Sequence, residues 1–299
     1  MDRCNLCGHD DWAVHLTCDD FPSGHLVRCR HCGLIRVGRL PSREEIVGYY
    51  QDEYYKKGGG RFVGVVEKLV YFFRWCRAQE VMRLAPPGRI LDVGCGRGLM
   101  LSILKQAGWD VTGTQISKNA ATYAREILGV EVFEGDLLEA RFPSHSFDVV
   151  TLYVVLEHLP NPSEYLDELH RLLKPNGWLI LEMHNAAALE ARLFGCKWLA
   201  WDPPYHLYHF TPQVLTAALE KKGFRVVKTR FFSLEYSPFT LLQTILNAFS
   251  RGKNLLFRFI QATTPEARQG FRLSLVVLHG LLACLLALLL LLVPALSGA

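Results

Sequence analysis

Four cysteines near the start of the chain have the spacing of a metal site. Cys4 and Cys7 form one Cys-x-x-Cys pair, and Cys29 and Cys32 form a second pair after a gap of 21 residues. A two-residue gap lets one tight turn present two thiolates, and two such turns supply the four soft ligands of tetrahedral zinc. A glycine follows each pair and permits the positive φ that such turns favour. We therefore predict that residues 1–40 form a zinc ribbon with a closed, structural Zn2+ site.

A glycine loop is the second segment suited to chemistry. Residues 90–98 read Ile-Leu-Asp-Val-Gly-Cys-Gly-Arg-Gly, following a strand pattern and opening a helix pattern. Glycine lets the backbone turn sharply and come close to a ligand. A lone glycine-rich loop is weak evidence, since related loops bind NAD and FAD. Here Gly94, Gly96 and Gly98 are spaced Gly-x-Gly-x-Gly, with Asp92 two residues before the first. No Gly-Lys-Ser/Thr follows, which excludes a phosphate-binding P-loop.

Histidines occur at two places where they could move a proton. His158 directly follows Glu157, while His206 and His209 belong to the proline-containing segment 201–210. That segment also holds two tyrosines, and it is too polar for an ordinary core element. An imidazole with a pKa of about 6.5 is a suitable general base near neutral pH. We predict His158, His206 and His209 as candidate bases. The alternatives are that Glu157 and His158 only shape a pocket and that His206 caps loop backbone.

The elements that must position these residues alternate along the chain. Strands separated by helices of ~10–15 residues indicate βαβ units and a mainly parallel sheet, which predicts an α/β fold. Ligands bind such sheets outside the carboxyl ends of the strands, where the glycine loop and the segment 201–210 would lie. The expected strands are 89–94, 110–115, 131–134, 147–153, 177–183 and 224–232, and the expected helices are 98–107, 118–128, 162–173 and 212–222.

The glycine loop and four later segments together resemble the class I S-adenosylmethionine-dependent methyltransferases. In order along the chain, 110–117 looks like the second strand and its end, and 135–137 looks like the acidic turn after the third. Residues 147–159 look like the fourth strand with its loop, and 173–179 look like the turn into the fifth. The resemblance spans 85–232. It implies a Rossmann-like sheet and S-adenosylmethionine as the methyl donor.

The resemblance also implies roles for the residues of the glycine loop. Gly94, Gly96 and Gly98 would pack under the amino-acid and ribose portions of the donor. Asp92 would support the loop, through water or through the ammonium group of the donor.

Three further residues would hold the rest of the donor. Asp136 would meet the adenine amino group, and Leu137 would donate a backbone N–H. Most relatives have Glu or Asp at the position of Gln115 to accept both ribose hydroxyls, so this chain departs from the pattern. An amide can accept from one hydroxyl and donate to the other. Lipid-modifying cyclopropane synthases also lack an acid there, which favours a lipid-like substrate.

The chemistry expected of such an enzyme makes few demands on its residues. A sulfonium has a good, neutral leaving group, so alignment dominates and a base is needed only for a hydroxyl or carbon-acid acceptor. Some quinone O-methyltransferases resemble the stretch around His158 and hold a divalent metal with Glu-x-x-Glu-His. Here the first of those positions is Val154, which argues against a catalytic metal. The pattern Pro-x-His-Leu-Tyr-His-Phe at 204–210 resembles methyltransferases of surface-polysaccharide and glycolipid pathways.

Charge is distributed unevenly along the chain, whose formal net charge is +4. Residues 221–272 carry ten Lys and Arg against two Glu, and 273–299 carry no formal charge. An apolar run of ~20 residues can cross a bilayer, and a basic flank is typical of the cytoplasmic side. We predict a basic amphipathic neck at 236–272 and an apolar membrane segment at 273–299, either spanning or lying in the membrane. Alternatively, 273–278 supply a seventh strand.

The predicted organisation is a zinc ribbon at 1–40, a helical lid or linker at 41–84, a donor-binding domain at 85–235, and then the neck and the membrane segment. A tyrosine cluster at 49–55 is the candidate lid, the alternative being an exposed helix face. The first residues show no secretory signal, so we expect the cytoplasm, at the inner face of the membrane.

These features favour a methyltransferase that acts on a membrane lipid or on a lipid-linked or glycan acceptor. One alternative is an RNA-base methyltransferase with a zinc ribbon. Nucleic acid is the less favoured partner because the five arginines of 1–40 are balanced by five aspartates, leaving no net charge to neutralise phosphates. The other alternative is a non-catalytic scaffold that binds the donor. The sequence indicates neither the acceptor atom nor the oligomeric state.

Overall fold

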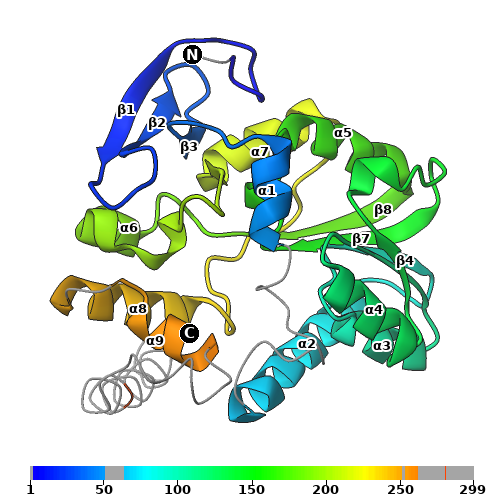
Figure 1. The fold of residues 1–299 in the computed structure, drawn as a ribbon. Coiled ribbons are helices and arrows are strands. Elements are labelled where there is room, and N and C mark those ends of the chain that lie inside the picture. The colour runs from blue at the N-terminus through cyan, green and yellow to red at the C-terminus, as the bar shows by residue number, and fades with distance from the viewer. Residues whose placement is uncertain (1–2, 51–63, 251–252, 262–279, 281–299) are drawn as a thin grey trace, which may run out of the picture. The chain divides into compact units, whose positions relative to one another are not determined.

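The computed structural model describes residues 3–50, 64–250, 253–261 and 280. The chain divides into two compact units (Figure 1). The first comprises residues 1–60, 70–187 and 202–229, and the second comprises 61–69, 188–201 and 230–299.

A five-stranded parallel sheet forms the centre of the first unit, in the order β6-β5-β4-β7-β8. Its central strands are buried on both faces, as near-continuous apolar runs predict: Ile90, Leu91, Val149 and Val150 are fully inaccessible to solvent. Each of the five strands confirms a strand expected from the sequence. They are β4 (Arg89–Val93), β5 (Asp110–Gln115), β6 (Glu131–Glu134), β7 (Phe147–Tyr153) and β8 (Leu173–Glu182).

Helices cover both faces of this sheet (Figure 1). On one face, α3 and α4 pack with the α2 residues Ala78 and Val81 over a core that includes Leu101, Leu104 and Ala124. On the other face lies α5, whose Tyr165, Leu166 and Leu169 are buried. The helices of the first unit are α1 (Arg43–Tyr50), α2 (Gly64–Leu84, from residue 70 on), α3 (Leu99–Gln106), α4 (Lys118–Glu126), α5 (Pro162–Leu172) and α7 (Pro212–Lys221).

A second, antiparallel sheet joins the N-terminal segment to the rest of the first unit. Its order is β1-β2-β3-β9, with β1 (Trp12–Thr17), β2 (His25–Cys29) and β3 (Ile35–Val37) coming from the first 40 residues. The fourth strand, β9 (Tyr208–His209), comes from the segment after the main sheet and pairs Ile35 with His209. The side chain of Asn5 also donates to the hydroxyl of Tyr208 at 2.6 Å. The N-terminal strands and residues 202–210 are therefore parts of one compact unit.

One predicted strand is wrong. Residues 224–232 form no strand, and Val227, Phe231 and Phe232 are 57–74% exposed. A strand buried on both faces needs a near-continuous apolar run. Here Arg225, Lys228 and other charges interrupt the run, so neither face could be buried.

The second unit contains α6 (Leu189–Phe194), α8 (Ser237–Phe249), α9 (Leu255–Gln261) and the 3-10 turns 195–197 and 199–201. Polar side chains of α8 hold it together. The Thr244 hydroxyl accepts from the Leu199 amide at 3.0 Å, and the Asn247 amide group donates to the Lys197 carbonyl at 3.1 Å. The first part of the predicted neck thus packs against its own unit through buried polar groups.

Within the described part of the chain, none of the helices combines the length and the apolar character needed to cross a bilayer. The predicted membrane segment 273–299, apart from Gly280, lies outside the described residues, as do 262–272 of the neck and the alternative seventh strand at 273–278. The tyrosine cluster at 49–55 lies outside the side chains that the structure describes.

Candidate active site

The glycine loop joins the end of β4 to the start of α3 in a conformation that requires glycine. Gly94, Gly96 and Gly98 have φ values of +68°, +57° and +72°. A Cβ at Gly94 would come within 2.7 Å of Cγ2 of Val155, the residue that follows β7 by two positions. The loop is therefore held against the segment after β7.

Asp92 is buried at the end of β4, beside this loop. Its carboxylate accepts a hydrogen bond from the Thr151 hydroxyl on β7 at 2.7 Å. Burial raises the pKa of Asp92 to about 6, against the opposing effects of the Thr151 hydrogen bond and of Arg77. Burial makes the charged form of Asp92 less favourable, and a cationic group bound beside it would stabilise that charged form.

Gln115 is the last residue of β5, and Asp136 follows β6 by two residues at the same edge of the sheet. The buried Gln115 accepts from the Ser117 amide through Oε1 at 2.9 Å, which leaves its NH2 group as the hydrogen-bonding end available to a ligand. Asp136 caps the 3-10 turn Leu137–Glu139, with Oδ1 accepting from the Leu138 amide at 2.9 Å and Oδ2 accepting from the Tyr165 hydroxyl. The predicted donor-binding residues thus lie at the ends of β4, β5 and β6.

The three predicted bases lie together at the ends of β7 and β8, with two groups that complete a cluster. The ring of His206 lies 4.7 Å from that of His158, 5.3 Å from that of His184 and 6.2 Å from that of His209. Oε1 of Glu157 lies 3.6 Å from Nδ1 of His184. A backbone hydrogen bond of 2.8 Å from the Leu207 amide to the Glu157 carbonyl holds the segment 201–210 over the end of β7.

The surroundings of His158 and His209 favour their neutral imidazoles. Burial, and then the neighbouring His206, lower the pKa of His158 to about 4. Burial also lowers the pKa of His209 well below its usual value. Burial raises the pKa of the Glu157 carboxyl, but contact with His184 and the nearby imidazoles more than offsets this, so the pKa of Glu157 is lowered. Nδ1 of His158 lies 2.9 Å from the Tyr205 carbonyl, so Nδ1 donates there and Nε2 carries the lone pair.

Comparison with known proteins identifies the family of this chain. Residues 71–229, more than half of the chain, match the family described as "Methyltransferase domain". The chain belongs to this methyltransferase family.

The relatives of this methyltransferase agree in their names. A ubiquinone biosynthesis O-methyltransferase of Bordetella avium is 30% identical over 182 residues, covering 56% of this chain and 73% of that protein. One of Paracidovorax citrulli is 29% identical over 167 residues, covering 51% and 68%. Among solved structures, an S-adenosylmethionine-dependent methyltransferase of Archaeoglobus fulgidus is 26% identical and covers 54% of this chain and 73% of that one, with a TM-score of 0.45. This chain is an S-adenosylmethionine-dependent methyltransferase.

The ribbon of this methyltransferase brings its four predicted cysteine ligands together. The Sγ atoms of Cys4 and Cys32 are 3.5 Å apart, those of Cys7 and Cys29 are 3.6 Å apart, and all four lie within 4.8 Å of one another. All four are free thiols. Zn–S bonds of about 2.3 Å in a tetrahedron place sulfurs about 3.8 Å apart, so the donor set fits zinc.

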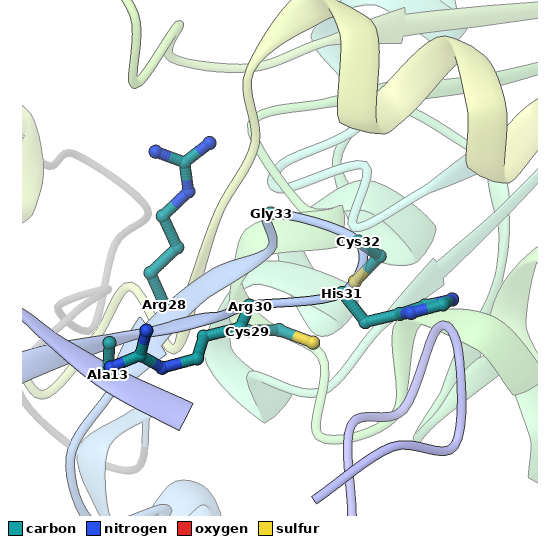
Figure 2. A pocket seen from close by; sticks show the side chains of 7 residues that line it. All are labelled: Ala13, Arg28, Cys29, Arg30, His31, Cys32 and Gly33. Carbon is teal, nitrogen blue, oxygen red and sulfur yellow. The ribbon is translucent and has the colours of Figure 1, made fainter. Parts of the chain in front are cut away.

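A hollow of about 440 Å³ lies on the ribbon beside two of these cysteines (Figure 2). Cys29 and Cys32 line it, and Arg28 points away from their thiols (Figure 2). Arg30 is paired with Asp11 at 3.4 Å. The hollow therefore borders the predicted zinc site and shares no residue with the histidine cluster.

Sequence reasoning missed His184, and it treated Glu157 only as the neighbour of His158. The signal for His184 was present, because it follows β8 by two residues, and the carboxyl ends of the strands are where ligands bind. Thr151 and Tyr165, which hold Asp92 and Asp136, belong to a strand and a helix whose patterns show only burial.

Proposed function

We propose that this methyltransferase transfers the methyl group of S-adenosylmethionine to a hydroxyl oxygen of a lipid-linked or glycan acceptor at the cytoplasmic face of the membrane. The observation that carries the proposal is the histidine cluster directly beside the glycine loop. Val155 lies against Gly94, and Glu157 and His158 follow two and three residues later. Donor and proton acceptor would thus share one edge of the sheet.

The donor would lie across the ends of β4, β5 and β6. Gly94, Gly96 and Gly98 would pack under its amino-acid and ribose portions, and the Asp92 carboxylate would attract its ammonium group. The NH2 group of Gln115 would donate to a ribose hydroxyl.

The adenine would lie by Asp136 and Leu137. Both carboxylate oxygens of Asp136 are held by protein groups, the Leu138 amide and the Tyr165 hydroxyl, which fixes the direction of their remaining lone pairs. Such fixed acceptors suit the adenine amino group, and the N–H of Leu137 lies at the start of the same turn.

The chemical step needs alignment and one proton acceptor. The acceptor oxygen attacks the methyl carbon as the S–CH3 bond breaks, leaving a neutral thioether, and the hydroxyl proton passes to an imidazole. His158, His206 and His209 are the candidates, and His158 presents a neutral Nε2 because Nδ1 faces the Tyr205 carbonyl. Neutral imidazoles are required for this role, which the lowered pKa values of His158 and His209 supply.

The nature of the acceptor is supported from two sides. Relatives about 30% identical are named as O-methyltransferases of ubiquinone biosynthesis, which supports an oxygen acceptor on a lipid-like molecule. The uncharged segment 273–299 and the basic segment 221–272 support anchoring at a membrane, which raises the local concentration of a membrane-resident acceptor. The ribbon zinc, held by Cys4, Cys7, Cys29 and Cys32, would be structural, since four protein thiolates leave no open position.

The test supplies methyl-labelled S-adenosylmethionine to the full-length enzyme with membranes of its own source. We expect label in the lipid or lipid-linked glycan extract and none in RNA. Alanine variants of His158, His206 and His209 are assayed in parallel, and loss of the base should lower kcat by about 10²–10⁴-fold with unchanged donor affinity. Label in RNA, or full turnover in all three variants, contradicts the proposal.

A further inference from the structure

A buried carboxylate without hydrogen bonds lies in the middle of the histidine cluster. Glu157 is 3% exposed, and neither of its carboxylate oxygens accepts a hydrogen bond from any group in the described part of the chain. Nδ1 of His184 lies 3.6 Å from its Oε1. A buried charge is costly unless it is paired with an ion or binds a metal. The site therefore calls for a cation.

The groups around Glu157 are those that transition metals prefer. One ligand atom from each of Glu157, His184 and His206 lies within 4.8 Å of the others. Metal–ligand bonds of 2.0–2.2 Å place ligand atoms roughly 3.0–3.5 Å apart, so the most separated pair of the set needs to close by at most about 1.3–1.8 Å. Two imidazoles and a carboxylate are a common ligand set of open zinc and iron(II) sites, while magnesium and calcium favour oxygen ligands.

We propose that Glu157, His184 and His206 bind a divalent transition-metal ion such as Zn2+ at the acceptor side of the active site. The three ligands come from separate segments, at the ends of β7 and β8 and in 201–210, whose backbones are fixed to one another. The Val154 amide donates to the Glu182 carbonyl at 2.7 Å, and the Leu207 amide donates to the Glu157 carbonyl at 2.8 Å.

This site differs from the metal-binding pattern considered for the sequence. The first position of the Glu-x-x-Glu-His pattern is Val154, which cannot ligate a metal, and this argued against a metal at this turn. Histidines from two other segments take its place beside Glu157.

The metal site also assigns roles in the methyl transfer, and this assignment, unlike the metal site itself, rests on the proposed function. Three protein ligands leave coordination positions open, and an acceptor hydroxyl oxygen is a suitable ligand for one of them. A bound cation favours the deprotonated form of that hydroxyl. With His206 engaged as a ligand, His158 and His209 remain as the candidate proton acceptors.

The experiment measures metal stoichiometry and spectra on the full-length protein. Protein stripped with a chelator is titrated with Co2+ alone and followed by absorption, because thiolate ligands give intense near-ultraviolet charge-transfer bands and nitrogen and oxygen ligands do not. We expect two equivalents to bind, one with the thiolate bands of the ribbon and one with visible bands only. Glu157→Gln and the less buried His184→Gln should each lose the second equivalent and keep the first.

Matched controls are Glu164→Gln and His170→Ala, which change an exposed glutamate and an exposed histidine on α5. Both should bind two equivalents. Binding of S-adenosylmethionine to each variant, measured by calorimetry, shows that the fold is intact. A wild-type protein that binds only the thiolate equivalent overturns the metal site. Failure to bind the donor or to transfer a methyl group would instead count against the proposed function, so the two failures are distinguishable.

Discussion

Replacing Gly94 with alanine tests the close packing of the donor loop against the segment after β7. Two costs add at this position. A residue with a Cβ in the left-handed region costs roughly 1–2 kcal/mol, and φ at Gly94 is +68°. The new Cβ would also come within 2.7 Å of Cγ2 of Val155, a short β-branched side chain that has little freedom to move away. Overpacking of this kind typically costs about 1–3 kcal/mol.

Gly108 provides the matched control for the first of these costs. It has φ of +88°, and a Cβ there would meet nothing within 4 Å. Gly108→Ala should therefore lose only about 1–2 kcal/mol of stability. Gly94→Ala should lose about 1–3 kcal/mol more, which corresponds to a melting temperature roughly 2–12 °C below that of the control.

The assay combines thermal unfolding with calorimetry of S-adenosylmethionine binding on both variants under the same conditions. We expect Gly108→Ala to bind the donor as tightly as the wild type does and Gly94→Ala to bind it at least ten times more weakly. Equal melting temperatures and equal donor affinities for the two variants would refute the reasoning, because the contact with Val155 and the donor-binding role of the loop would both be absent.

Four further outcomes are expected. Burial raises the pKa of Asp92 to about 6, so the affinity of the enzyme for the donor should fall as the pH drops through 6. The Asp92→Asn variant should bind the donor ten- to a hundredfold more weakly at pH 8. Its affinity should not show this pH dependence. By linkage, the Asp92 contribution to the stability of the donor-free enzyme should be greatest below pH 4 and be lost as the pH rises through 6, and urea unfolding over that range checks the sign. Cys7→Ser should lose the ribbon zinc and, through the pairing of β3 with β9, increase hydrogen exchange at the His209 amide; unchanged exchange in zinc-free protein contradicts this. Tyr208→Phe should cost about 1–3 kcal/mol, because its hydroxyl donates to the Pro160 carbonyl and accepts from Asn5, and a double-mutant cycle with Asn5→Ala should show that the two losses are not additive.

The donor side of the active site could be predicted from the sequence because its determinants are local. Each of the five strands is a short apolar run, and the glycine loop, Gln115 and Asp136 directly follow strands that the pattern locates. The segment 224–232 was predicted wrongly by the same logic. Its β-rich composition suggests a strand, but its charges prevent burial on two faces.

The acceptor side could be predicted only in part because it depends on pairing between distant segments. His158, His206 and His209 were recognisable as polar residues in an unusual setting, but their approach to Glu157 and His184 depends on how 201–210 returns to the end of β7. A two-residue strand such as β9 has no periodicity of its own. Its partner, β3, lies more than 170 residues earlier in the sequence.

That two-residue strand has a consequence for how this enzyme can diversify. The ribbon contributes three strands to its sheet, and the fourth is supplied by the same stretch of backbone that carries two of the histidines. A ribbon taken from a related protein would present a different edge strand for β9 to pair with. We expect that change to move His206 and His209 even if every histidine were kept. We therefore expect the ribbon and the histidine segment to vary together among such chains, because each supplies part of one sheet.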